Sequence, residues 1–349
     1  MQHGDNAQPA APGGARAVGT TARELPGGVH PWVAEHRGSV RFGVLGGPRT
    51  AAWTEFLDYV QAAAGLGFDA YWMSDHPLWI TDCWATLAAL AVSTKTIRLG
   101  SLVSCVDFRS PVELARVAAD VDRWSAGRLV LGIGIGDNIN DEYRRMGVAL
   151  LPTRERQVRL EETIQIVRGL WQPTPLTFAG RHFRVADANV PPGPAQQPRV
   201  PILIACGGER VTLRQVAQYA DMSNFGPSRW TGSAFDAEDV RRKCAALHGH
   251  CEALGRSYDA ILRSCFTGPV VCAETAADVR DQLDAIPQAT KDLVGPSLVG
   301  GTPRELIVYY QTFVDAGMQY FVAMNPSLET MRLLAERVIP ELVPSGRPT

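Results

Sequence analysis

The most regular feature of the 349-residue chain is an alternation between two hydrophobic patterns. Short runs of apolar and β-branched residues, typical of buried strands, begin near residues 41, 69, 97, 128, 201, 221, 261 and 319. After each run, apolar residues recur at spacings of three and four, which predicts a helix. Eight strands alternating with eight helices predict a (β/α)8 TIM barrel of the α/β class. A doubly wound open sheet has the same alternation and is the alternative.

The expected helix starts agree with this interpretation, and two intervals interrupt it. Pro111, Pro152 and Pro303 stand where the first turn of a helix tolerates a missing N–H. Residues 172–200 contain a predicted hairpin and a proline-rich return, and residues 273–300 contain one extra predicted helix. Neither interval is long enough for a domain of its own. We therefore expect both to be insertions that cover the mouth of the barrel.

Composition and charge are typical of a globular protein with one large domain or two ordinary ones. Residues 39–345 are expected to form a single domain, and residues 1–38 a disordered leader that lacks the apolar core of a secretory signal. A net charge of −2 gives no reason to expect nucleic acid or a membrane as partner, and no apolar run approaches the ~20 residues of a membrane span. Seven cysteines without a CxxC pair indicate neither disulfides nor a metal site, and favour the cytoplasm.

Polar residues gather at the ends of the predicted strands, where a TIM barrel carries its chemistry. The second strand leads into Asp75 and His76, the third into Cys105, the fourth into Asp137 and Asn138, and the fifth into Cys206, Gly207 and Gly208. His76 can exchange a proton near neutral pH, although a histidine held by loop carbonyls would have the same sequence context. Asp137 can act as a catalytic acid or cap the following helix.

The segment LVLGIGIGDN at residues 129–138 places Gly132, Gly134 and Gly136 on one face of the fourth strand. A face without Cβ atoms lets a flat or bulky group approach the backbone closely. For Gly132 we favour relief of crowding inside the barrel, whereas Gly134 and Gly136, beside the strand end, are candidates for contact with a planar cofactor. The dinucleotide fingerprint G-x-G-x-x-G does not fit, because Asp137 replaces its third glycine.

Gly207 and Gly208 lie between the fifth strand and a helix expected to begin near Glu209. Exposed backbone amides at a helix N-terminus attract anions, so the pair is a candidate cradle for a phosphate or carboxylate. Glycines also occur at helix entrances simply to make the turn. The pattern leaves both readings open.

Taken together, these segments resemble the bacterial luciferase-like flavin oxidoreductases over residues 40–340. The resemblance is carried by SDH at 74–76, IRLGSLV at 97–103, SPVELARVAADVDRWSAGRLVLGIGIGDN at 110–138, RLEETIQIVRGLW at 159–171 and PILIACGG at 201–208. It implies a TIM barrel. One branch of the family uses reduced FMN and oxygen as monooxygenases, and the other uses the deazaflavin coenzyme F420 for hydride transfer without oxygen.

The motif SDHPLW at residues 74–79 is similar to the deazaflavin branch, and in particular to its sugar-phosphate dehydrogenases. There, the histidine and the following tryptophan flank the reactive ring carbon, which assigns these roles to His76 and Trp79. Asp137 stands where those enzymes have a glutamate, so its carboxyl group reaches one methylene less far.

The resemblance also implies a site for the cofactor. A non-proline cis peptide near Leu102 and Val103 would form a bulge behind the ring, and the backbone from Ala205 to Gly208 would hold the anionic or ribityl part. The expected cofactor site is completed by Asp75, Cys105, Gly134, Gly136 and Asn138, and the expected substrate pocket contains Trp79 and Trp230.

The sequence therefore favours a coenzyme F420-dependent oxidoreductase that acts on a small organic substrate, with a role in secondary metabolism. The two insertions contain no cluster of basic residues, which favours a neutral, unsaturated natural-product-like substrate over a sugar phosphate. An FMN-dependent monooxygenase and a cofactor-free accessory subunit are the alternatives. The resemblance implies a homodimer and a separate enzyme that reduces the cofactor.

Overall fold

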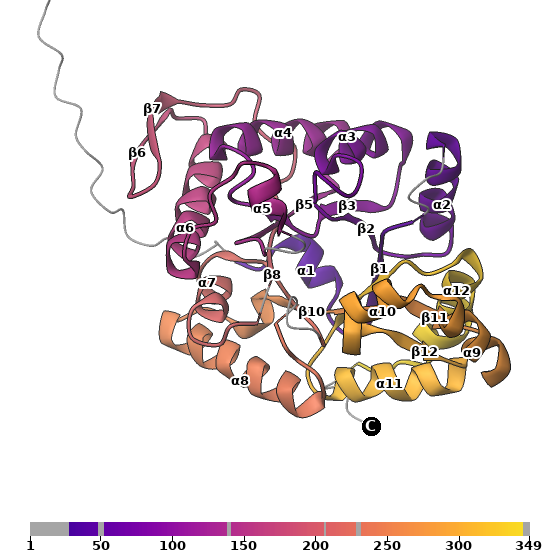
Figure 1. Ribbon diagram of the computed structural model, residues 1–349. Helices are drawn as coiled ribbons and strands as arrows, with labels where there is room; N and C mark the ends of the chain where they lie inside the picture. Colours follow the sequence, from indigo (N-terminus) through magenta and orange to yellow (C-terminus); the bar gives the residue numbers. More distant parts are fainter. Residues whose placement is uncertain (1–27, 48–51, 138–140, 206, 228–231, 345–349) are drawn as a thin grey trace, which may run out of the picture.

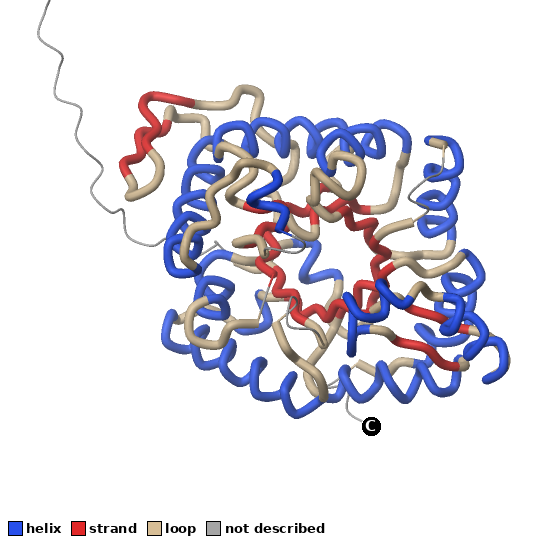
Figure 2. The backbone as a smooth tube through the Cα atoms, viewed as in Figure 1, coloured by secondary structure: helices blue, strands red, loops and turns tan. Residues whose placement is uncertain are grey.

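Eight parallel strands close into a barrel, which confirms the predicted TIM barrel and excludes the open sheet (Figure 2). The computed structural model describes residues 28–47, 52–137, 141–205, 207–227 and 232–344. The barrel strands are β1 (Arg41–Leu45), β2 (Ala70–Met73), β3 (Arg98–Ser101), β5 (Leu129–Gly134), β8 (Ile202–Ala205), β9 (Met222–Phe225), β10 (Leu262–Thr267) and β13 (Tyr320–Met324). Their order is β3-β2-β1-β13-β10-β9-β8-β5, and pairing of β3 with β5 completes the circle. The short β4 (Ser104–Cys105) extends along β5.

Helices occupy the eight places that the sequence predicts and surround the barrel (Figure 1). They are α2 (Trp53–Gly65), α3 (Cys83–Ser93), α4 (Pro111–Trp124), α6 (Thr153–Leu170), α7 (Thr212–Tyr219), α8 (Ala237–Leu254), α11 (Pro303–Asp315) and α12 (Leu328–Leu333). A π-helical turn, η4 (Leu334–Val338), and a 3-10 turn, η5 (Ile339–Glu341), extend the last of them. Pro111 and Pro303 take the first helical position, as expected. None of the helices in the described ranges has the length and apolar character needed to span a membrane.

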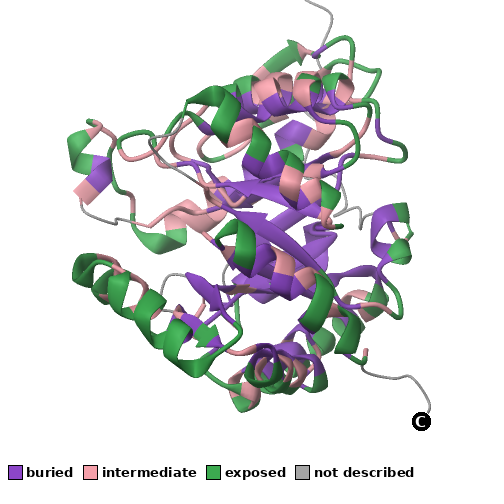
Figure 3. Ribbon diagram, turned by 90° about the vertical axis from the view of Figure 1, so that its right-hand side faces the viewer, coloured by how far each residue is buried: buried purple, intermediate pink, exposed green. Residues whose placement is uncertain are grey.

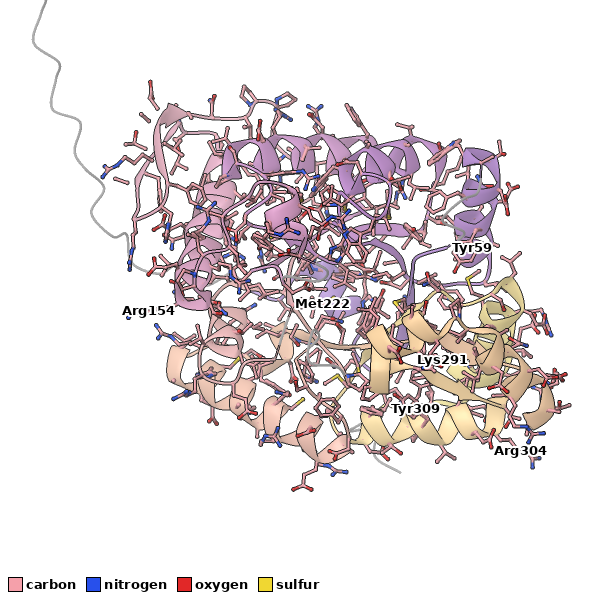
Figure 4. All side chains as sticks on the ribbon, in the orientation of Figure 1. Tyr59, Arg154, Met222, Lys291, Arg304 and Tyr309 are labelled. Carbon is pink, nitrogen blue, oxygen red and sulfur yellow. The ribbon has the colours of Figure 1, made fainter. Side chains whose placement is uncertain are left out.

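The barrel strands are buried on both faces, as Figure 3 shows by purple strands between partly green helices. Outward-pointing residues such as Leu131 and Ile133 pack under the helices, and inward-pointing residues fill the barrel. Met222, labelled near the barrel centre in Figure 4, belongs to this inner set. Continuous apolar runs are the pattern expected of parallel strands covered on both sides.

Trp72 fills much of the barrel interior. Its side chain is fully buried, and its Nε1 donates a hydrogen bond to the Tyr320 hydroxyl at 3.2 Å. Gly43 and Gly100 provide the space, because a Cβ at either position would overlap the indole ring. Trp72 is therefore a packing residue.

The N-terminal side of the barrel is closed by α1 (Pro31–Glu35). Trp32 and His36 are fully buried, and both contact the carboxylate of Asp69: Trp32 Nε1 lies 3.3 Å from Oδ2, and His36 Nε2 lies 3.1 Å from Oδ1. Burial raises the pKa of Asp69, but the hydrogen bond and charge of His36, together with Arg98 and Arg41, outweigh it, and the pKa is lowered. A buried carboxylate thus anchors α1 under the barrel.

Part of the predicted leader is therefore ordered. Residues 31–35 form α1 and pack against the barrel because Trp32 can bury its ring there. Residues 1–27 lie outside the described ranges, so disorder remains a prediction for them. The single domain expected over residues 39–345 also remains a prediction.

The two insertions lie on different sides of the barrel. Residues 172–200 contain the predicted hairpin, β6 (Leu176–Ala179) and β7 (Arg184–Ala188), which lies outside α6 (Figure 1). This segment does not cover the mouth, contrary to expectation. It connects a helix to the following strand, and such connections run along the N-terminal side of a TIM barrel.

Residues 273–300 follow a strand and precede a helix, so they belong to the mouth. They contain the expected extra helix as α9 (Ala276–Ala285) and a second one, α10 (Gln288–Val294), that the sequence analysis missed. Two short strands, β11 (Val270–Cys272) and β12 (Val299–Gly301), pair beside them. The remaining short elements are α5 (Glu142–Arg145), η2 (Tyr258–Ala260) and η3 (Gly295–Ser297).

We predict that Asp69→Asn destabilises the protein by about 2–3 kcal/mol at pH 7, because buried donors of α1 lose a charged acceptor. A lowered folded-state pKa means that the ionised Asp69 stabilises the fold above its ordinary pKa of 3.8, and that this contribution is lost as the pH falls through the folded-state value. Urea unfolding of both proteins should therefore give a constant difference from pH 5 to 7 that shrinks only below 3.8.

Asp281→Asn, at an exposed position on α9, is the matched control and should change stability little at any pH. If Asp69→Asn has no larger effect than this control at pH 7, Asp69 is not the anchor of α1.

Candidate active site

A cavity of about 520 Å³ opens at the carboxyl ends of the barrel strands. Most of the predicted site residues line it, from four different strand ends: Asp75, His76, Trp79, Leu102, Val103, Cys105, Gly136, Asp137 and Ala205. Three predicted residues, Asn138, Cys206 and Trp230, lie outside the described residues. The cavity is where the barrel geometry places chemistry, and its position does not depend on any single motif.

His76 is paired with a residue that the sequence analysis missed. Its Nδ1 lies 2.9 Å from Oε2 of Glu142, whose side chain is fully buried in α5. The backbone N–H of Leu78 approaches the other oxygen, Oε1, at 3.4 Å. Because a carboxylate only accepts hydrogen bonds, it favours the proton on Nδ1 and leaves Nε2 as an acceptor. Nε2 has no hydrogen-bond partner among the described residues.

Asp75 is held by Arg109, which follows β4. The guanidinium forms an ion pair with Oδ2 of Asp75, and its other end lies 2.9 Å from Asp82. Burial raises the pKa of Asp75, although the charge of Arg109 opposes the shift. The second oxygen of Asp75, Oδ1, is buried without a hydrogen bond of normal geometry among the described residues, although the Ser104 side chain is near enough to oppose this rise in the pKa of Asp75.

Trp79 carries a similar unpaired group. Its indole Nε1 is buried without a hydrogen-bond partner among the described residues, and its ring lies 6.4 Å from that of His76. Buried polar atoms in native proteins are nearly always paired. One unpaired donor on Trp79 and one unpaired acceptor on Asp75 therefore suggest a ligand with polar edges.

The peptide bond between Leu102 and Val103 is cis, as the family resemblance implies. Both residues line the cavity, so the bulge that they form is one of its walls. Gly134 lies behind this bulge: it is buried, and a Cβ there would lie 2.7 Å from Cγ2 of Val103. The space left by Gly134 is thus filled by Val103, and Gly134 is not among the residues that line the cavity, so its contact with a cofactor remains a prediction.

Gly136 does line the cavity, and its φ of +70° favours glycine. A Cβ at this position would overlap the Tyr143 hydroxyl and lie 2.6 Å from Sγ of Cys105. Sγ itself lies 3.2 Å from that hydroxyl. Burial raises the pKa of the Cys105 thiol to about 12, so Cys105 is a neutral wall residue.

Gly207 and Gly208 differ from the expected cradle. The helix after them begins at Thr212 instead of near Glu209, and Val211 precedes it. Gly207 is buried and accepts a hydrogen bond from Lys243 Nζ at 2.8 Å, whereas Gly208 is exposed. Neither residue belongs to the set that lines the cavity. Their role in binding an anionic part of a cofactor remains a prediction.

Few features of the sequence point to Glu142 and Arg109 as site residues. Glu142 lies 66 residues from its partner His76, and Arg109 lies 34 residues from Asp75. Both lie in connections that follow strands of the barrel, Glu142 at the start of α5 and Arg109 after β4. These connections come together only in the folded barrel. An acidic residue shortly after a glycine-rich strand was the one available hint.

A closed barrel with a cavity and a paired histidine at the carboxyl ends of its strands has the architecture of a TIM-barrel enzyme. A sequence profile of the luciferase-like monooxygenases matches residues 34–319. The chain therefore belongs to the luciferase-like monooxygenase family, which confirms the resemblance seen in its sequence.

Relatives with assigned activities are similar over most or part of the chain. An F420-dependent glucose-6-phosphate dehydrogenase of Kineococcus radiotolerans is 28% identical over 347 residues, which covers 90% of this chain and all of the relative. An F420-dependent hydroxymycolic acid dehydrogenase of Mycobacterium tuberculosis is 32% identical over 207 residues, covering 57% and 54% of the two chains.

Solved structures agree on the fold. The F420-dependent tetrahydromethanopterin reductase of Methanopyrus kandleri superimposes with a TM-score of 0.72 at 18% identity. An F420-dependent secondary alcohol dehydrogenase in complex with an F420-acetone adduct gives 0.73 at 18% identity. Each covers 87% of this chain and 99% of the other. These likenesses establish the common barrel.

We predict that Cys105 resists alkylation in the folded protein although it lines the cavity. A pKa of about 12 leaves roughly one thiol in ten thousand ionised at pH 8, and the thiolate is the reactive form. Mass spectrometry after treatment with iodoacetamide at pH 8 should show Cys105 unmodified in folded protein and modified after unfolding in urea. Rapid labelling of the folded protein would contradict the buried, neutral thiol.

Proposed function

We propose that this protein is an oxidoreductase that uses coenzyme F420 to move a hydride to or from the carbon of a hydroxyl or carbonyl group in a small organic substrate. The observation that carries the proposal is the pair of His76 and Glu142, which places an imidazole with an available Nε2 on the cavity wall. The F420-dependent relatives of the chain support the choice of cofactor.

The residues present fit a deazaflavin. The apolar bulge of Leu102 and Val103 would contact a face of the ring, and the unpaired atoms of Asp75 and Trp79 would bind polar groups at its edge. Ala205, at the end of β8, would face the cofactor from the other side. When bound, coenzyme F420 supplies the ring carbon that accepts or donates the hydride.

His76 accepts or donates the proton of the reaction. In the oxidation of an alcohol, the carbinol hydrogen leaves as hydride with the electron pair of its C–H bond, and the electron pair of the O–H bond becomes the second bond between carbon and oxygen. The hydroxyl proton passes to Nε2 of His76, and in the reverse reaction Nε2 returns it to the carbonyl oxygen. Glu142 keeps the proton of Nδ1 in place and stabilises the imidazolium that forms, so it is a positioning residue.

Asp137 lies on the same wall and is a second candidate for proton transfer. Its side chain is one methylene shorter than the glutamate expected from the resemblance. In this proposal Asp137 contacts substrate or cofactor, and His76 remains the principal base.

Three further parts of the proposal concern the setting of the enzyme. A second enzyme regenerates the cofactor, because one half-reaction leaves it in the wrong redox state. The six described cysteines are all free, which supports a cytoplasmic location. A homodimer rests on the family resemblance, and gel filtration with light scattering tests it.

We predict that the purified protein binds coenzyme F420 more tightly than FMN in either redox state. The measurement is a fluorescence titration with each cofactor. Gly134→Val should weaken binding of coenzyme F420 at least about tenfold, because the added methyl groups displace Val103 and the bulge. Gly249→Val, at a position in α8 with no atom within 4 Å of the added Cβ, should leave affinity unchanged.

Tighter binding of reduced FMN would make this chain a monooxygenase, and binding of neither cofactor would make it an accessory subunit. Both results contradict the proposal. Equal affinity of Gly134→Val and the native protein would show that the bulge is not part of the cofactor site.

We predict that His76→Ala lowers kcat by about 10²–10⁴-fold, with little change in the affinity for coenzyme F420, because the base and not the binding surface is lost. Glu142→Gln should lower kcat by at least about tenfold and alter the pH profile, since the charge that supports the imidazolium is removed. Steady-state kinetics from pH 5 to 9 and cofactor titration give both quantities. A normal kcat for His76→Ala would remove His76 from the mechanism.

A further inference from the structure

We infer from the described residues of the cavity that the substrate is an uncharged, largely apolar alcohol or the matching carbonyl compound, and not a phosphorylated sugar. This inference rests on the proposed function and names the substrate class of the same site. It differs from the substrate in the name of the Kineococcus relative, which is glucose 6-phosphate.

The charges around the cavity are the first argument. Three acidic residues, Asp75, Asp137 and Glu142, line it, and no lysine or arginine does so among the described residues. Arg109 is engaged with Asp75 and Asp82 through both ends of its guanidinium. A phosphate monoester carries nearly two negative charges at pH 7 and needs cations or several N–H donors in a partly buried site. The described wall offers it no unengaged cation, because the charges of Arg109 and Asp75 compensate each other.

Apolar residues on one side of the cavity also favour an apolar substrate. Trp53 and Phe56 from α2, Ile80 from the loop after β2, and Leu293 and Val294 from α10 all line it. Trp53 and Leu293 are also exposed, at 42% each. Large apolar side chains kept partly in water at a cavity entrance indicate that a ligand of similar character covers them.

These apolar residues lie away from the strand expected to hold the anionic part of the cofactor. In Figure 1, α2 and α10 lie on the right of the barrel, and β8 and α7 lie on the left. A cofactor tail at β8 therefore leaves the side of α2 and α10 to the substrate. His76 and Trp79 stand on the wall of the same cavity, so a substrate carbinol near His76 would direct its remaining groups toward α2 and α10.

Lys291 is the cation on α10, and Figure 4 labels it there. It does not line the cavity: its Nζ donates to the carbonyl oxygen of Asp284 in α9 at 3.3 Å. The residues of α10 that do face the cavity are Leu293 and Val294. We therefore assign to these two residues, and not to Lys291, the selection of the substrate.

The test is calorimetric titration of the full chain, with and without coenzyme F420, by 2-butanol, 2-octanol, 1-phenylethanol, glucose and glucose 6-phosphate. Affinity should rise with the apolar area of the neutral alcohols, because each buried methylene adds to binding. The two larger alcohols should bind at least about tenfold more tightly than glucose 6-phosphate. Enzyme turnover with the same compounds should follow the same order.

A gain-of-binding variant makes the test sharper. Val294→Arg places a cation on the cavity wall and should raise the affinity for glucose 6-phosphate at least about tenfold, while weakening that for 2-octanol. Val308→Arg is the matched control, since Val308 is 68% exposed on α11 and does not line the cavity. Lys291→Gln should change neither affinity.

Tighter binding of glucose 6-phosphate than of the alcohols by the native protein would overturn the inference. So would loss of its binding in Lys291→Gln, or an affinity for alcohols that is absent or independent of their apolar area. Failure of the proposed function is a separate result: the chain would then not bind coenzyme F420, while the ligand preference of the cofactor-free protein could still be measured.

Discussion

The close approach of β3 and β5 at Gly132 is the constraint on which the site depends. A Cβ at Gly132 would overlap the carbonyl oxygen of Ser101, and Ser101 Oγ donates to the Gly132 carbonyl at 2.7 Å while accepting from its N–H at 3.1 Å. Here the chain leaves β3 and turns through the cis bond into the bulge. Because Gly132 has no side chain, β3 and β5 can pair closely at this point. The bulge that forms one wall of the cavity begins at the same point.

The alternating glycines of β5 thus perform different tasks along one strand. The space beside Gly132 holds the backbone carbonyl of Ser101, and the space beside Gly134 holds the side chain of Val103. The space beside Gly136, at the cavity, holds the side chains of Cys105 and Tyr143. From the sequence, we expect Gly132 to relieve crowding inside the barrel and Gly134 and Gly136 to contact a planar ring. The predicted spacing of two residues was right, but the groups that fill the spaces could not be read from the sequence, because they belong to residues 101–105 and to Tyr143 of α5, whose register against β5 has no local signal.

Local patterns could be predicted in the rest of the chain too, whereas contacts between residues far apart in sequence could not. The eight strands and helices follow from local hydrophobic spacing, and His76 follows from its position at a strand end. Glu142 and Arg109 act across tens of residues, through loops whose path has no periodic pattern. The hairpin at 176–188 was recognised, and its side of the barrel could also have been predicted, because the order of predicted elements already made this segment a connection from a helix to the following strand.

In the proposed function, the residue that transfers the proton and the residues that would contact the rest of the substrate lie on separate connections of the barrel. His76 follows β2 and is oriented from α5, whereas Leu293 and Val294 belong to α10, far along the chain. If α10 selects the substrate as proposed, replacing its apolar side chains would change what the cavity admits without disturbing the imidazole or the barrel strands. Exchange of one surface helix would then give new substrates during evolution, while the reaction chemistry would be inherited unchanged.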